Sequence, residues 1–142
     1  MKTPLVLIAV VGALAATGTA MSDSPIAVEA GRSAYGSILF DGRGFVLYSF
    51  TADSPRASRC AGACAKAWPP FSVKTRPVAA KGLAQKLVGR VRRSDGSYQA
   101  TYAGHPLYYY VGDRKPGQIL CQGVSEFGGF WRVIRPSGTP VK

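Results

Sequence analysis

Short apolar runs separated by turn-forming residues make up most of the chain beyond its N-terminal segment. The runs are residues 37–40, 45–50, 98–103 and 107–111, and the turns between them are residues 41–44 and 104–106. Apolar runs of about four to eight residues bounded by Gly, Asp and Pro are typical of β-strands. The pattern therefore predicts two antiparallel hairpins, each followed by a loop.

The rest of the pattern adds two strands and two short helices. The expected strands are residues 88–92 and 130–134, and the expected helices are residues 57–67 and 79–88. Pro69 and Pro70 end the first helix, because proline cannot continue one. The pair Asp41-Gly42 is expected to supply the positive φ of the first hairpin turn. The sequence thus predicts a mainly β protein with one or two short helices.

The two hairpins form an internal repeat. Residues 44–53 align without gaps on residues 104–113. Units of this size seldom bury their apolar face alone. We therefore expect a single domain, residues 21–142, made of two repeats at about residues 33–75 and 88–138 that share one core.

The N-terminus has the pattern of a secretory signal peptide. Lys2 precedes an apolar run at residues 5–16, and small residues follow as far as Ala20. The run is shorter than the ~20 residues that span a bilayer. We predict a signal peptide at residues 1–20 and an exported protein, periplasmic or secreted, with no transmembrane segment after cleavage.

Composition adds a strong positive charge. The 142 residues include 18 Lys and Arg against 7 Asp and Glu, a net charge of +11. An exported basic protein is drawn to an anionic surface or to a protein of the envelope, and nucleic acid is not an expected partner there. In the dense run 90–93, alternation places Arg90 and Arg92 on one face. We interpret this run as a solvated edge strand and not as a docking patch.

Little in the chain indicates catalysis. His105 is the only histidine, and the chain has no haem-attachment motif, nucleophile elbow or phosphate-binding loop. The set closest to a soft-metal site is Cys60, Cys64 and Cys121 with His105. Among seven acidic residues no carboxylate pair stands out. We therefore expect no enzyme, no catalytic, cofactor-binding or metal-binding residues, and no cofactor.

Two disulfide pairings are compatible with these residues. A helical turn brings Cys60 within about 6 Å of Cys64, whereas an extended chain holds them about 13 Å apart, beyond the ~7 Å limit for a bridge. The chain-entropy estimate is about 2 kcal/mol for this small loop and about 4 kcal/mol for a bridge from Cys60 to Cys121. Energy alone favours the long bridge, and local geometry favours the short one.

A repeated aromatic and acidic motif identifies a family. Its positions are Tyr48, Phe50 and Asp53 in one copy and Tyr108, Tyr110 and Asp113 in the other. This Yx(FWY)xxD signature resembles that of bacterial predicted lipoproteins, also called secreted repeats of unknown function. Supporting runs lie at residues 60–70, 95–108 and 128–131. The resemblance implies an exported cell-envelope protein of paired repeats, with no activity to transfer.

The resemblance also bears on the cysteines. It implies the local pair Cys60–Cys64, and we adopt that pairing. The chain departs from the family pattern in two ways: it has no cysteine for lipid attachment near the cleavage site, and Cys121 stands where the family usually has Gly. Cys121 is then left unpaired, either buried as a small apolar residue or available for dimerisation.

The motif has a structural and a binding interpretation. Alternation sends Tyr48 and Phe50 to one face of a strand, where their rings pack into the core, and the Asp just beyond caps the following loop. Exposed aromatics beside carboxylates would instead suit a ring-shaped ligand. Two equivalent copies favour the structural role. We therefore expect a structural or interaction module, with a binder of a sugar or lipid and a redox accessory protein as alternatives.

Overall fold

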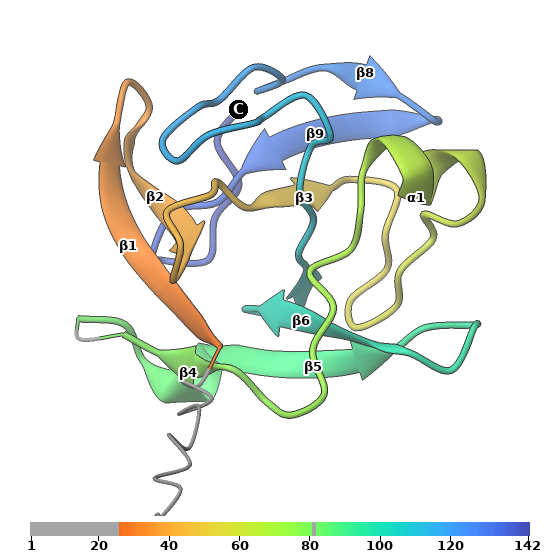
Figure 1. Cartoon of the computed structure of the whole chain (residues 1–142), viewed down its shortest axis with the longest axis horizontal. Coiled ribbons are helices and arrows are strands. Elements are labelled where there is room, and N and C mark those ends of the chain that lie inside the picture. The colour runs from red at the N-terminus through yellow and green to blue at the C-terminus, as the bar shows by residue number, and fades with distance from the viewer. Residues whose placement is uncertain (1–25, 81) are drawn as a thin grey trace, which may run out of the picture.

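The computed structural model describes residues 26–80 and 82–142 (Figure 1), so the predicted signal peptide lies outside the described residues. The elements are β1 (Ala27–Ser33), β2 (Gly36–Asp41), β3 (Tyr48–Phe50), α1 (Ala63–Ala67), β4 (Val78–Ala79), the 3-10 turn η1 (Gln85–Leu87), β5 (Val88–Arg92), β6 (Tyr98–Tyr102), β7 (His105–Pro106), β8 (Ser125–Glu126) and β9 (Gly129–Val133). The predicted mainly β class is confirmed.

The strands form three small sheets, with the orders β2-β1-β4, β3-β9-β8 and β5-β6-β7. In Figure 1 the β1–β2 hairpin lies at the left, the β5–β6 hairpin at the bottom and the β8–β9 hairpin at the top, with β3 between them. The first two hairpins occupy equivalent places in the two repeats, with Val28 opposite Asp41 in one and Val88 opposite Tyr102 in the other. As expected, β5 is an edge strand, and Arg90 and Arg92 are exposed on it.

Both predicted helices differ from the structure. The helix expected at 57–67 is confined to α1, and the helix expected at 79–88 is replaced by β4, η1 and the start of β5. The Gln85 side chain explains the second difference, because it accepts from the backbone N–H of Ala79 at 2.7 Å and donates to the carbonyl of Pro77 at 3.0 Å. These two bonds hold the segment as a loop.

The strand expected at 107–111 is interrupted. Tyr108 forms isolated bridges with Tyr48 and Pro70 in place of a continuous ladder. Pro69 and Pro70 lie opposite this segment, and since proline has no N–H they cannot donate to it. The strand β1 was not predicted, because only Val28 of its seven residues is buried and its apolar pattern is weak.

The first turn places its positive φ two residues later than predicted, at Gly44 and not at Gly42. Gly44 has a φ of +85°, whereas Gly42 is not in the left-handed region. A Cβ at Gly44 would lie 3.1 Å from Pro116, so this position is also sterically tight. Glycine is therefore required at position 44. The Asp41 carboxylate holds the same turn by accepting from the backbone N–H groups of Arg43 and Phe45.

The buried side chains form two core clusters, because alternate residues of a strand point to opposite faces of that strand. The first cluster contains Ile38, Phe40, Val46, Tyr48, Phe50, Cys60, Cys64, Trp68, Tyr108, Trp131, Val133 and Val141. The second contains Val28, Leu39, Leu47, Phe71, Val73, Val88, Ala100, Tyr102, Leu107 and Ile134. Neighbouring residues such as Leu47 and Tyr48 enter opposite clusters, as the period of two requires. Both repeats contribute to both clusters.

Each repeat also completes the backbone pairing of the other. Tyr48 and Tyr108 exchange two N–H to C=O bonds, each of 2.9 Å. The N–H of Leu39 donates to Ile134 at 2.9 Å, and in the equivalent place the N–H of Ala100 donates to Phe71 at 2.8 Å. The C-terminal segment of each repeat thus lies against the hairpin of the other, and the two copies are interleaved.

Candidate functional site

The repeated motif forms two hydrogen bonds that cross between the repeats. The hydroxyl of Tyr48 donates to Oδ2 of Asp113 at 2.7 Å, and the hydroxyl of Tyr108 donates to Oδ2 of Asp53 at 2.8 Å. The tyrosine of each copy is therefore paired with the aspartate of the other. The sequence places these residues at equivalent positions but gives no sign of the exchange.

The second oxygen of each aspartate holds the loop that follows it. Oδ1 of Asp53 accepts from the N–H of Arg59 at 2.7 Å, and Oδ1 of Asp113 accepts from the N–H of Leu120 at 3.0 Å. This is the geometry expected of a loop cap. Each aspartate thus accepts hydrogen bonds from its own loop through one oxygen and from the other repeat through the second oxygen.

Burial raises the pKa values of the two aspartates and the two tyrosines that form the exchanged pairs. It raises the pKa of Asp53 and of Asp113, and the hydrogen bonds that each carboxylate accepts partly offset the rise. Burial also raises the pKa of Tyr48 and of Tyr108 far above the ordinary phenol value. The two tyrosines are consequently neutral donors at physiological pH.

Four aromatic rings stack at the junction of the repeats. Trp68 and Trp131 are parallel within 2°, with ring centroids 4.0 Å apart. Phe50 stacks on Trp131 at 4.1 Å, and Tyr110 lies tilted over Trp68 at 4.7 Å. Each motif aromatic thus covers the tryptophan of the other repeat. Both tryptophans and Phe50 are buried, whereas Tyr110 is half-buried, so the stack lies inside the protein and reaches the surface only at Tyr110.

The local disulfide Cys60–Cys64 is present, with Cα atoms 5.3 Å apart. The turn that closes it is centred on Gly62, which has a φ of +57°, and α1 begins only after this turn. Cys121 is a free, half-buried thiol packed against the first cluster. Burial raises the pKa of Cys121, and the neighbouring Tyr110 hydroxyl partly offsets this rise.

A half-buried arginine beside the disulfide was not anticipated. The Arg93 guanidinium donates to Ser58 Oγ at 2.8 Å, to Gln99 Oε1 at 2.7 Å and to the Cys60 carbonyl at 2.6 Å. Ser58 Oγ in turn lies 2.6 Å from the Tyr108 hydroxyl. The sequence predicts the run 90–93 as a solvated strand, and its pattern does not distinguish Arg93 as the residue whose side chain is half-buried.

The other residues considered for chemistry lie apart from this network. His105 is half-buried in β7, and burial lowers its pKa although its side chain hydrogen-bonds to Gly138. Within residues 26–80 and 82–142, no group of three or more His, Cys, Asp or Glu side chains is placed to hold a metal ion. The same residues contain no helix with the length and apolar character needed to cross a bilayer.

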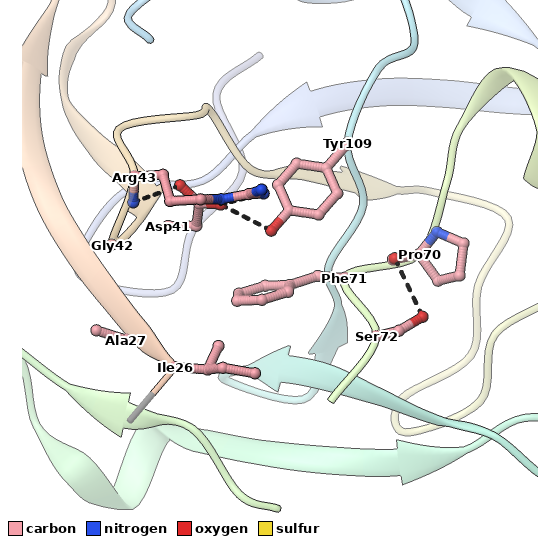
Figure 2. Close-up of a pocket in the computed structure, with 9 residues that line it drawn as sticks. All are labelled: Ile26, Ala27, Asp41, Gly42, Arg43, Pro70, Phe71, Ser72 and Tyr109. Atoms are coloured by element: carbon pink, nitrogen blue, oxygen red, sulfur yellow. Dashed lines mark hydrogen bonds and ion pairs between the residues drawn. The ribbon is translucent and has the colours of Figure 1, made fainter. Parts of the chain in front are cut away.

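Among the cavities lined by the described residues, two open on the surface and are relevant to binding. The first, here called the aromatic cavity, has a volume of about 560 Å³, and its lining includes Phe71, Tyr109, Pro70, Ile26, Arg43 and Ser72 (Figure 2). The second, here called the basic hollow, has a volume of about 500 Å³, and its lining includes Arg56, Arg76, Lys86 and Arg90. Both volumes fall in the range of small-molecule sites, about 300–1,000 Å³. The sequence predicted neither cavity.

Comparison with known proteins places the chain in a family of repeats. A family described as a secreted repeat of unknown function matches residues 30–72 and 89–135. The chain belongs to this family. No curated protein and no solved structure shows a significant match to it. The secreted-repeat family thus matches the chain in two separate segments, and the family description supports an exported protein.

Proposed function

We propose that this member of the secreted-repeat family is a non-catalytic interaction module of the cell envelope, periplasmic or secreted, whose basic hollow binds an acidic polysaccharide. The observation that carries the proposal is the lining of the hollow. Four cationic side chains enter it, Arg56, Arg76, Lys86 and Arg90, and none of the described residues that line it is acidic. Such a concentration of like charge is favourable when an anion binds there.

Two of these cations are held in place by the backbone. The Arg76 guanidinium donates to the carbonyls of Val88 at 2.6 Å and Gln85 at 2.8 Å. The Arg90 guanidinium donates to the carbonyl of Lys74 and stacks over the Tyr98 ring at 3.9 Å. These contacts fix the guanidinium groups without neutralising their charge. A fixed cation loses less conformational entropy on binding an anion.

The shape of the hollow favours a polymer of acidic sugars over a flat lipid surface. Carboxylate groups that project from a chain can enter a concavity. Among the described residues that line the hollow, Leu87 and Val88 are the only large aliphatic side chains. A protein that binds bilayers usually adds aromatic or aliphatic side chains that insert between headgroups. Anionic vesicles are therefore the comparison that tests this choice.

Binding to polygalacturonate, measured by calorimetry at low and at physiological salt, tests the proposal. The double variant Arg56→Gln/Lys86→Gln should bind about twofold to thirtyfold more weakly, because it removes two exposed charge contacts, each worth about 0.2–1 kcal/mol. The matched control is Arg114→Gln/Lys115→Gln, which removes two exposed charges outside the hollow. Equal losses in both variants would show that net charge alone acts. Tighter binding to phosphatidylglycerol vesicles would assign the hollow to membranes.

A further inference from the structure

The aromatic cavity combines apolar walls with one cation at its rim. Phe71 forms its floor and is 4% exposed, while Ile26 stands at the edge and is 45% exposed. Figure 2 shows Phe71 projecting between Ile26 on one side and the group of Asp41, Arg43 and Tyr109 on the other. The walls would therefore contact the apolar body of a ligand, and the polar group of that ligand would meet Arg43.

Asp41 is not available to a ligand, because its carboxylate is fully used. Oδ1 accepts from the N–H groups of Arg43 and Phe45, each at 2.9 Å. Oδ2 accepts from Nε and Nη2 of Arg43 at 3.0 Å and 2.8 Å, and from the Tyr109 hydroxyl at 2.9 Å. Asp41 is 3% exposed. It acts as an anchor that orients the guanidinium and the phenol.

Arg43 keeps a free donor edge. Its Nη1 donates to no group among the described residues, and its side chain is 70% exposed although the other two nitrogens are held by Asp41. The guanidinium lies over the Phe45 ring at 5.3 Å and near the Tyr109 ring at 5.8 Å. An arginine oriented in this way presents N–H groups to a carboxylate without first paying the entropy of ordering its side chain.

The lining selects against sugars. Besides Arg43, Ser72 is the one lining side chain with a loosely held polar group, since its hydroxyl donates to the Pro70 carbonyl at 3.4 Å. A sugar brings several hydroxyl groups that need partners once they leave water. A ligand with one acidic group and an apolar body leaves no such group unpaired.

We propose that the aromatic cavity binds a small amphiphilic acid, in which an apolar ring or chain lies against Phe71, Tyr109 and Ile26 and a carboxylate is held by Arg43. This site is separate from the basic hollow, and the two linings share no residue. Loss of polysaccharide binding would therefore leave it intact.

Titration of the full exported chain with phenylacetate and with octanoate, followed by amide NMR, tests this proposal and distinguishes a ring from an acyl chain. We expect saturable shifts around Arg43 and Ser72 for at least one acid, and much weaker binding of the matched neutral alcohols, 2-phenylethanol and 1-octanol. Arg43→Gln should weaken the acid about tenfold or more, as expected when a charge-assisted hydrogen bond is lost. Arg32→Gln, an exposed cation of β1 outside the lining, should bind like the unmodified protein.

Arg43→Gln also removes two hydrogen bonds to Asp41, so a second variant tests the cavity without changing the Asp41 turn. Ser72→Phe fills the cavity from the opposite rim, where the serine is exposed and makes only its weak local bond. It should abolish binding while the NMR spectrum stays folded. Equal affinity for acid and alcohol, unchanged binding in Ser72→Phe, tighter binding of galactose, or no saturation by either acid would each overturn the proposal.

Discussion

At the scale of the residue, the spacing of the family motif has a physical explanation. The tyrosine and the second aromatic are two residues apart, so they face the same cluster, and the aspartate lies beyond the strand where its carboxylate reaches two donors. Each carboxylate thereby couples a loop of its own repeat to the phenol of the other. This explains why the tyrosine, the aspartate and their separation recur together.

The exchanged pairs predict a specific pattern of coupling. Asp53→Ala should lower the free energy of unfolding by about 1–2 kcal/mol, the range for losing a side-chain cap, and Tyr108→Phe by about 1 kcal/mol. In a double-mutant cycle the two changes should be non-additive by at least about 0.5 kcal/mol, because they break the same bond. Urea denaturation measures all three.

The control is a second double-mutant cycle that pairs Asp53 with Tyr102. The Tyr102 hydroxyl donates to the Pro136 carbonyl and not to an aspartate. Tyr102→Phe and Asp53→Ala should be additive. Additivity in the Tyr108 cycle as well would contradict the structural role of the motif. Loss of ligand binding with unchanged stability in Asp53→Ala would point to a binding role instead.

At the scale of the element, the sequence predicts strands well where apolar residues alternate on two buried faces. The predicted strands 37–40 and 98–103 belong to this class and become β2 and β6. The predicted strand 45–50 is shortened to β3, with Val46 in an isolated bridge to Phe40. Prediction from the sequence fails where the pairing of a strand depends on residues far away in the chain. β1 has one buried side chain and is held by its register with β2, and the 107–111 segment is interrupted by prolines from the other repeat.

The site is less accessible to sequence than the fold. The motif residues and the local disulfide pair are identified in advance, but the exchange of hydrogen bonds, the inward turn of Arg93 and both cavities depend on segments far apart in the chain. Arg76 and Arg90, for example, enter the same hollow as Arg56. Their sequence context is that of any solvated basic residue, so pattern alone cannot separate them from the other cations.

The Cys60–Cys64 disulfide closes a turn between the motif strand and α1, and it should stabilise the protein by about 2 kcal/mol, as the chain-entropy estimate gives for so small a loop. Urea denaturation with and without dithiothreitol measures this directly and leaves the packing volume unchanged. Cys121→Ala should show the same effect of the reductant, since Cys121 is the free thiol. Cys60→Ala/Cys64→Ala should show none. A reductant effect that disappears in Cys121→Ala would mean that the bridge involves Cys121 in solution.

At the scale of the whole molecule, the two repeats are interdependent. Both core clusters draw residues from both copies, and β3 of the first repeat pairs with β9 of the second. Trp68 and Trp131, one from each repeat, are in contact at the centre of the aromatic stack. A separated repeat would expose its part of each cluster and leave the backbone groups that face its partner without hydrogen bonds.

This interdependence predicts how the chain behaves when it is divided. Fragments 26–80 and 81–142, expressed separately, should each lack a cooperative unfolding transition, because a unit of about 60 residues that lacks half of its core is too small to fold alone. Mixed at equal concentration, they should associate and recover the near-ultraviolet circular dichroism of the stacked tryptophans. A second fragment carrying Trp131→Ala should fail to restore this signal, whereas one carrying Arg114→Gln, an exposed residue, should restore it fully. Cooperative unfolding of either fragment by itself would refute the interleaved arrangement, since a repeat that folds alone does not need the strand supplied by its partner.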